Sequence, residues 1–131
     1  MNRPTLDLQV LPGTHAVCRL GPEEPIPAWA LAPGGFASFT RTREELSVLC
    51  EDRRVPEGIP AERGFRILKV RGPLDFVLTG VLASLADPLA TAGISLFAVS
   101  TFDTDYVLVR AGKLAEAIAV LRAAGHRVAL D

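Results

Sequence analysis

The stretch SLFAVSTFDTDYVLVR, residues 95–110, decides the fold of this chain of 131 residues. Two apolar runs, residues 96–99 and 106–109, flank a short polar centre at residues 100–105. Apolar runs separated by a short polar segment are typical of a β-hairpin, and we place its tip at residues 102–104. Because this hairpin also gathers hydroxyls and carboxylates on a hydrophobic scaffold, it is the first place to look for a bound ligand.

The composition indicates a globular protein of one domain, or of two very small modules that share a core. Hydrophobic residues make up 49% of the chain and charged residues 22%, so a substantial core can form. A net charge of -1 gives no basic surface for a phosphate backbone, and we expect no nucleic acid partner. The chain lacks the apolar runs of a secretory signal or a membrane helix, so we expect a cytoplasmic protein without a membrane partner.

The N-terminal part predicts short strands between proline-rich loops. Residues 6–10 alternate between apolar and polar side chains, and a Pro12-Gly13 turn is expected to pair them with residues 15–20 in a first hairpin. Further strands are expected at residues 36–40 and 46–51. Trp29, in a proline-rich segment, is expected to cover the edge of the core, with stacking on a ligand as the alternative.

A charged segment rich in proline and glycine, DRRVPEGIPAERG at residues 52–64, separates this part from a more regular one. We therefore expect an irregular, strand-rich unit at residues 1–60 and a second unit at residues 61–131.

The second unit is predicted to have the element order β-α-β-β-α-β. A strand at residues 65–70 is followed by a helix with Asp75 at its N-cap and Gly93 at its end, then by the hairpin. A second helix ends at Gly125, and residues 126–130 form the last strand. This order predicts an α+β, ferredoxin-like fold with both helices on one face of a four-stranded sheet. Since the hairpin strands are apolar on both sides, the other face must also be covered, by the N-terminal part or by another copy.

Several functions that use this strand order do not fit the residues. An RNA-recognition module needs aromatic motifs on its central strands, and an acylphosphatase needs an arginine-bearing phosphate loop where this chain has Pro73 and Asp75. The histidines, His15 and His126, lie in strand patterns that favour a structural role. Cys18 and Cys50 are expected to be buried and inert, with redox or metal chemistry as the alternative. We expect no enzymatic activity, no cofactor and no metal ion.

Residues 72–109 carry a resemblance to a known family. Their glycine-proline start, the pattern LA-x-PLA-x-AGIS at the helix end and the hairpin ISLFAVST-x-x-TDYVLV resemble ACT domains, in particular those of small stand-alone bacterial proteins with two fused ACT-like units. The N-terminal pieces HAVCRL, IPAWA and FASFTRTREELSVLC resemble the first, less regular unit of these proteins. The hairpin is also similar to one in the animal cytosolic arginine sensors, which are built from tandem ACT units.

This resemblance implies a regulatory protein that binds a small molecule, commonly an amino acid, at an interface between ACT units. In the arginine sensors the ligand lies between the loop before the first helix and the hairpin, and a hairpin aspartate binds the cationic side chain. A homodimer would supply the remaining units. The positions that match are Leu74, Asp75 and Gly80 at the strand-to-helix turn, Thr101, Phe102 and Asp105 on the hairpin, and Ser95 from a neighbouring unit.

The residues themselves agree with this interpretation in part. Amide groups at the start of the helix after Asp75 could hold a carboxylate, and Asp105 could bind a cation. A purely structural interpretation stays open, in which Asp75 is only an N-cap, and Thr101 only satisfies backbone groups of the hairpin end. The alternative function is then an oligomerisation or interaction module without a small ligand.

Overall fold

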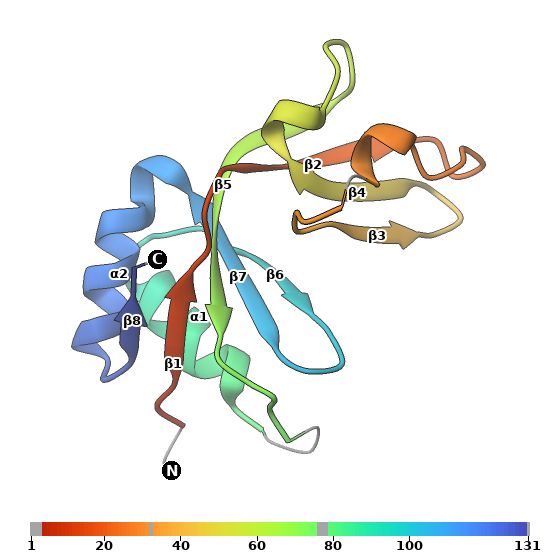
Figure 1. Cartoon of the computed structure of the whole chain (residues 1–131). Coiled ribbons are helices and arrows are strands. Elements are labelled where there is room, and N and C mark those ends of the chain that lie inside the picture. Colours follow the sequence, from red (N-terminus) through yellow and green to blue (C-terminus); the bar gives the residue numbers. More distant parts are fainter. Residues whose placement is uncertain (1–3, 32, 76–78, 131) are drawn as a thin grey trace. The chain divides into compact units, whose positions relative to one another are not determined.

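The computed structural model describes residues 4–31, 33–75 and 79–130 (Figure 1). The chain divides into two compact units. The helical unit contains the described residues of 1–12 and 66–131, and the strand unit contains those of 13–65. The N-terminal strand therefore belongs with the C-terminal half, whereas the sequence predicts that residues 1–60 form one unit.

The helical unit confirms the predicted element order. Its elements are β1 (Asp7–Val10), the C-terminal part of β5 (Ala61–Val70), α1 (Val81–Thr91), β6 (Phe97–Ser100), β7 (Asp105–Arg110), a 3-10 turn (Ala111–Lys113), α2 (Leu114–Ala123) and β8 (Arg127–Ala129). The strand order in its sheet is β6-β7-β5-β1-β8. From β5 to β8 the chain follows the order β-α-β-β-α-β, and the fold is α+β.

Strand β1 is an addition to this arrangement that the sequence does not predict. Leu8 lies opposite Val70 in an antiparallel pair with β5, and opposite Val128 in a parallel pair with β8. The predicted first hairpin is wrong, because β1 pairs with β5 and β8, and β2 pairs with β4 and β5. An alternating pattern identifies a strand but carries no information about its neighbour in the sheet.

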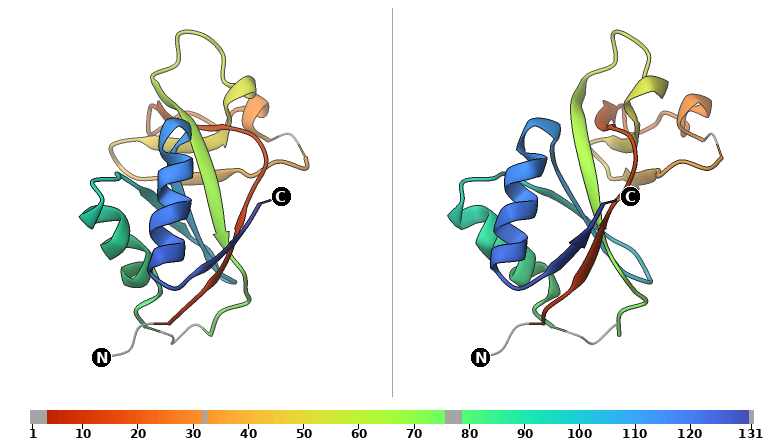
Figure 2. Two further views of the ribbon diagram at one scale, coloured as in Figure 1. Left: turned by 90° about the vertical axis from the view of Figure 1, so that its left-hand side faces the viewer. Right: turned by 60° about the vertical axis from the view of Figure 1, so that its left-hand side comes forward.

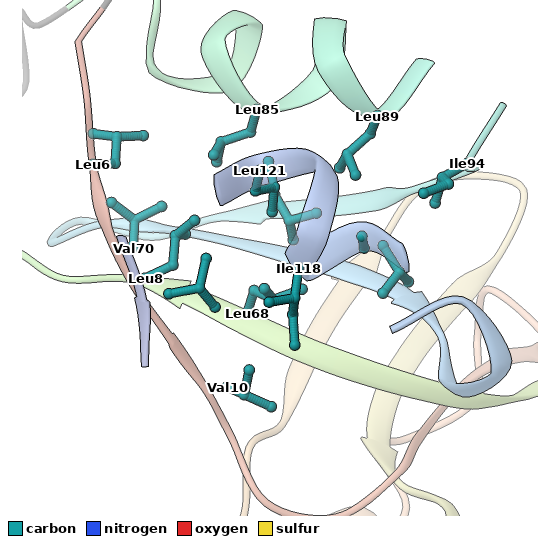
Figure 3. Close-up of a cluster of buried hydrophobic side chains, with 14 of the residues drawn as sticks. Leu6, Leu8, Val10, Leu68, Val70, Leu85, Leu89, Ile94, Ile118 and Leu121 are labelled. Carbon is teal, nitrogen blue, oxygen red and sulfur yellow. The ribbon is translucent and has the colours of Figure 1, made fainter. Parts of the chain in front are cut away.

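Both helices lie on the same face of this sheet, as Figures 1 and 2 show. Even-numbered side chains of β1 and β5 point at them, and the resulting core is drawn in Figure 3. Burying one large aliphatic side chain contributes roughly 1.5–3 kcal/mol, so this cluster is the main source of stability for the unit. Its labelled members are Leu6, Leu8, Val10, Leu68, Val70, Leu85, Leu89, Ile94, Ile118 and Leu121.

Helix α1 starts later than predicted. Its N-cap is Gly80, whose φ of 80° lies in the left-handed region that favours glycine, and no side chain caps the helix. Asp75 is thus not the N-cap, and residues 76–78, where the sequence predicts the first turn of the helix, lie outside the described residues. The predicted helix ends at Gly93 and Gly125 are confirmed, since both have positive φ just after α1 and α2.

The strand unit has the sheet order β3-β4-β2-β5. Its own elements are β2 (His15–Leu20), a 3-10 turn (Ala28–Ala30), β3 (Ser38–Arg41), β4 (Leu46–Glu51) and a 3-10 turn (Asp52–Arg54). Trp29 is half-buried and packs against the core of this unit, as expected of a residue at the core edge. Strand β5 begins at Ala61, inside the predicted seam, and so supplies a strand to each unit.

The sheet face of the helical unit that points away from the helices is only partly covered. Val107 and Val109 belong to the core under the helices, so Phe97 and Leu108, which lie opposite each other, must point the other way. Leu108 is fully buried, whereas Phe97 is 38% exposed. Full burial of this second face is therefore not observed at the edge strand β6.

Candidate ligand-binding site

A cavity of about 510 Å³ lies in the helical unit between the β5–α1 connection and the tip of the β6–β7 hairpin. This volume falls in the range of roughly 300–1,000 Å³ that is usual for small-molecule sites. The lining residues are Leu74, Asp75, Val81, Ser100, Thr101, Phe102, Asp103, Thr104 and Asp105.

The hairpin has the form predicted from the sequence. Ser100 and Asp105 are the last opposed pair of β6 and β7, and residues 101–104 form the connection between the strands. Within it, the amide and the hydroxyl of Thr101 both donate to the Thr104 carbonyl, at 2.9 and 3.0 Å. The Thr104 amide donates to the Thr101 hydroxyl at 3.3 Å. The Thr101 side chain thus satisfies backbone groups, which was the structural interpretation of this residue.

The tip of the hairpin is joined to the end of β5 and to the segment that follows. The Thr104 hydroxyl donates to the Val70 carbonyl at 2.7 Å, and the Leu74 amide donates to the Asp103 carbonyl at 2.8 Å. Gly72 lies against the same point, since a Cβ on it would be 3.1 Å from both the Asp103 carbonyl oxygen and the Thr104 Cβ. Any side chain here would push the hairpin away from the strand-to-helix connection.

Most of the site residues that the sequence suggested lie together. Leu74 and Asp75 line the cavity from one side, and Thr101, Phe102 and Asp105 line it from the other. Gly80 and Ser95 are not among the lining residues: Gly80 is the N-cap of α1, and Ser95 lies exposed before β6.

Thr104 has a larger role than the sequence predicts. It is expected to be an ordinary turn residue, but it is only 4% exposed and holds the hairpin in place. Threonine is common in turns, and no periodicity marks the one whose hydroxyl reaches across to another strand. The sequence also does not reveal the start of α1 at Val81, which places the helix N-terminus at the cavity wall.

The wall of the cavity is anionic. It carries the carboxylates of Asp75, Asp103 and Asp105, while the described lining residues include no lysine, arginine or histidine. Phe102, at the rim, is 84% exposed, whereas Asp105 is half-buried. A cationic group placed among these carboxylates would be attracted to them. The cavity is therefore suited to a ligand that carries an ammonium or guanidinium group.

His126 has the structural role that the sequence favoured. Its side chain is buried, its Nδ1 accepts a 3.1 Å hydrogen bond from the Leu6 amide, and its Nε2 donates to the Ser84 carbonyl at 2.9 Å. In a regular helix the amide of residue 88 would bind that carbonyl, but Pro88 has no amide hydrogen. His126 replaces the hydrogen bond that the proline removes, which explains how α1 continues to Thr91.

The two cysteines are buried and form no disulfide. Burial raises the pKa of the Cys18 thiol, and burial together with the nearby Cys18 raises the pKa of Cys50 to about 11. The reactive thiolate is therefore disfavoured at both positions, in agreement with the expected inert role.

The described part of the chain carries neither a metal-binding cluster nor a helix that could span a membrane. Among residues 4–31, 33–75 and 79–130, no three histidine, cysteine or acidic side chains are grouped so that they could hold a metal ion. Within the same residues, neither α1 nor α2 nor any 3-10 turn is long and apolar enough to span a membrane.

Comparison with known proteins identifies the family. A family model described as the ACT domain matches residues 61–123. The chain contains an ACT domain. A second family model, of an N-terminal domain, matches residues 13–58, which lie within the strand unit. A comparison with curated proteins gave no match.

Solved structures show how far the fold of this ACT domain protein is shared. A protein from Agrobacterium tumefaciens is 42% identical, with a TM-score of 0.91 over 98% of this chain and 95% of its own. A Vibrio cholerae protein described as a possible transport protein is 19% identical, with a TM-score of 0.73 over 92% and 90% of the two chains. The regulatory subunit of aspartate kinase from Thermus thermophilus is 12% identical, with a TM-score of 0.62 over 90% and 96%. The latter two likenesses concern the fold.

Proposed function

We propose that this ACT domain protein is a regulatory sensor that binds an amino acid with a basic side chain in the hairpin cavity. The observation that supports this proposal is the placement of three carboxylates around a cavity whose described lining residues carry no cationic side chain. The regulatory subunit of aspartate kinase, which shares the fold, gives the regulatory role a precedent.

The two ends of such a ligand would meet different parts of the wall. Its cationic end would lie beside Asp105, where a charge-assisted hydrogen bond contributes about 1.5–3 kcal/mol. Its carboxylate would lie toward Val81, where α1 begins without a side-chain cap and its dipole favours negative charge. Phe102, at the rim, would cover the ligand and could contact a guanidinium face.

The proposed role is regulation, and the protein would act as a homodimer in the cytoplasm. A second copy would cover the exposed rim at Phe102 and complete the site.

A thermal-shift screen against the twenty amino acids tests the proposal. A ligand at one hundred times its dissociation constant adds about 2.7 kcal/mol to the free energy of unfolding, which is a clear rise in Tm. We expect arginine and lysine to give the largest shifts, and aspartate and glutamate to give none. The absence of any shift at millimolar concentration would contradict the proposal, as would a preference for the acidic amino acids.

One observation favours a second candidate, an interaction module without a small ligand. Phe97 is 38% exposed on the edge strand β6, where a partner could add to the sheet. Replacing Phe97 with serine would then abolish self-association, as measured by light scattering, in a protein that responds to no amino acid. A response to arginine that survives this substitution would reject the second candidate.

A further inference from the structure

We propose that Thr104 is a positioning residue that gives the cavity its preference for cations, an inference that rests on the proposed function. Nothing in its sequence position singles it out, but of residues 101–104, all of them described, it alone is buried. Thr101, Phe102 and Asp103 are exposed, whereas Thr104 is only 4% exposed.

Every polar group of Thr104 is engaged. Its hydroxyl donates to the Val70 carbonyl at 2.7 Å, its amide donates to the Thr101 hydroxyl at 3.3 Å, and its carbonyl accepts from Thr101. A buried hydroxyl with a single short bond to another strand fixes the backbone on both sides of it. The neighbours on those two sides are Asp103 and Asp105, two of the three carboxylates of the cavity.

The hydrogen bond between Thr104 and Val70 also positions a second one, between Leu74 and Asp103. With Thr104 held on Val70, the Asp103 carbonyl lies 2.8 Å from the Leu74 amide and accepts its hydrogen bond. Gly72 permits this approach, because a Cβ there would be 3.1 Å from the Thr104 Cβ. We call these two hydrogen bonds, Thr104 to Val70 and Leu74 to Asp103, the hairpin latch.

The hairpin latch controls which groups face the ligand. It uses the Leu74 amide and the Thr104 hydroxyl internally, and the Thr101 amide is used within the hairpin, so these donors are withdrawn from the cavity. The part of the lining that the hairpin then presents to a ligand carries the carboxylates of Asp103 and Asp105. Opening the latch would release the Leu74 amide as a donor and displace Asp103 and Asp105, the neighbours of Thr104. Discrimination between charged and neutral ligands would then fall.

The experiment compares two substitutions of Thr104 with two probes. Thr104→Val removes the hydroxyl at nearly constant shape, and Thr104→Ser retains it. L-arginine and its neutral analogue L-citrulline are titrated into each full-length variant by calorimetry. Thr91→Val, on the exposed last residue of α1, is the matched control.

We expect the ratio of the citrulline to the arginine dissociation constant to fall about tenfold in Thr104→Val, because displaced Asp103 and Asp105 would lose charge-assisted contacts that arginine makes and neutral citrulline does not. Thr104→Ser and Thr91→Val should keep the ratio of the unsubstituted protein. A general loss of stability would weaken the binding of arginine and of citrulline equally, and the ratio of their dissociation constants would stay unchanged. Equal ratios in Thr104→Val and Thr104→Ser would overturn the inference.

Amide hydrogen exchange of the unligated variants separates this inference from the proposed function. In Thr104→Val the Leu74 amide should exchange faster, while the Arg127 amide, which bonds to Leu6, keeps its protection. If arginine does not bind the unsubstituted protein, the proposed function fails, and the exchange of Leu74 alone decides whether the hairpin latch exists. Unchanged protection of Leu74 in Thr104→Val would refute the latch even if arginine binds.

Discussion

The Nε2 of His126 donates a 2.9 Å hydrogen bond to the carbonyl oxygen of Ser84, the helical carbonyl that Pro88 leaves without an amide donor. The histidine lies just before β8, and its other ring nitrogen accepts from the Leu6 amide just before β1. One buried side chain therefore joins α1, the N-terminal segment and the C-terminal segment of the helical unit.

Replacing His126 with phenylalanine should lower the free energy of unfolding by about 2–4 kcal/mol, because it leaves the Leu6 amide and the Ser84 carbonyl buried without partners. Urea denaturation measures the change. In a Pro88→Ala background the helix can supply an amide to Ser84, so the cost of the same substitution should shrink by about 1 kcal/mol. Costs that are equal in the two backgrounds would show that the histidine does not compensate for the proline.

Replacing Gly72 with alanine should destabilise the protein by about 1–3 kcal/mol, since the new Cβ would lie 3.1 Å from the Asp103 carbonyl oxygen and 3.2 Å from the Leu74 amide nitrogen. Both neighbours are backbone atoms, which cannot rotate away. Gly112→Ala is the matched control, because a Cβ on Gly112 would meet no atom within 4 Å. A Gly72→Ala protein as stable as Gly112→Ala would mean that the hairpin tip is free to move.

Replacing Asp105 with asparagine should abolish most of the response to arginine. The loss of a charge-assisted hydrogen bond of about 1.5–3 kcal/mol corresponds to an affinity reduced roughly 10- to 150-fold. The Tm of the unligated protein should change little, because asparagine keeps the size and shape of the aspartate side chain. Glu57→Gln, on an exposed acidic residue of the strand unit, should leave both quantities unchanged. Full arginine affinity in Asp105→Asn would place the cation elsewhere.

The thiol of Cys50 should make stability depend on alkaline pH. Its pKa is raised by burial from 9.0 to about 11 in the folded protein, so the folded state holds the thiol proton more tightly than the unfolded state. The resulting stabilisation is complete below pH 9 and is lost as the pH rises toward 11. Between pH 9 and pH 11, the free energy of unfolding should fall more steeply for the natural chain than for Cys50→Ala. The same pH dependence in both proteins would contradict a raised pKa of Cys50.

The sequence was sufficient for features that depend on neighbouring residues along the chain. The β6–β7 hairpin, the glycines that end α1 and α2, and the order of elements from β5 to β8 all follow from local patterns of apolar, turn and capping residues. The grouping of Leu74, Asp75, Thr101, Phe102 and Asp105 at one cavity follows from the same order together with the resemblance to ACT domains.

Features that depend on contacts between distant segments do not follow from the sequence in this way. Aspartate is a favoured capping residue, which predicts an N-cap at Asp75, yet the helix starts at Val81 after a glycine with positive φ. The role of Thr104 depends on a carbonyl 34 residues away along the chain, and that of His126 on one 42 residues away. No local pattern reports such a partner.

The position of β1 between β5 and β8 determines how this protein can be dissected. A fragment that begins at residue 61, where the ACT family model begins, would lack a strand that supplies Leu8 and Val10 to its own core. Along the sequence, the strand unit is inserted between β1 and the C-terminal part of β5, which are adjacent strands of the helical unit. A shortened chain that keeps the helical unit intact must therefore delete residues 13–65 and join residue 12 to residue 66. Truncation at residue 61 would instead remove β1 from the helical unit.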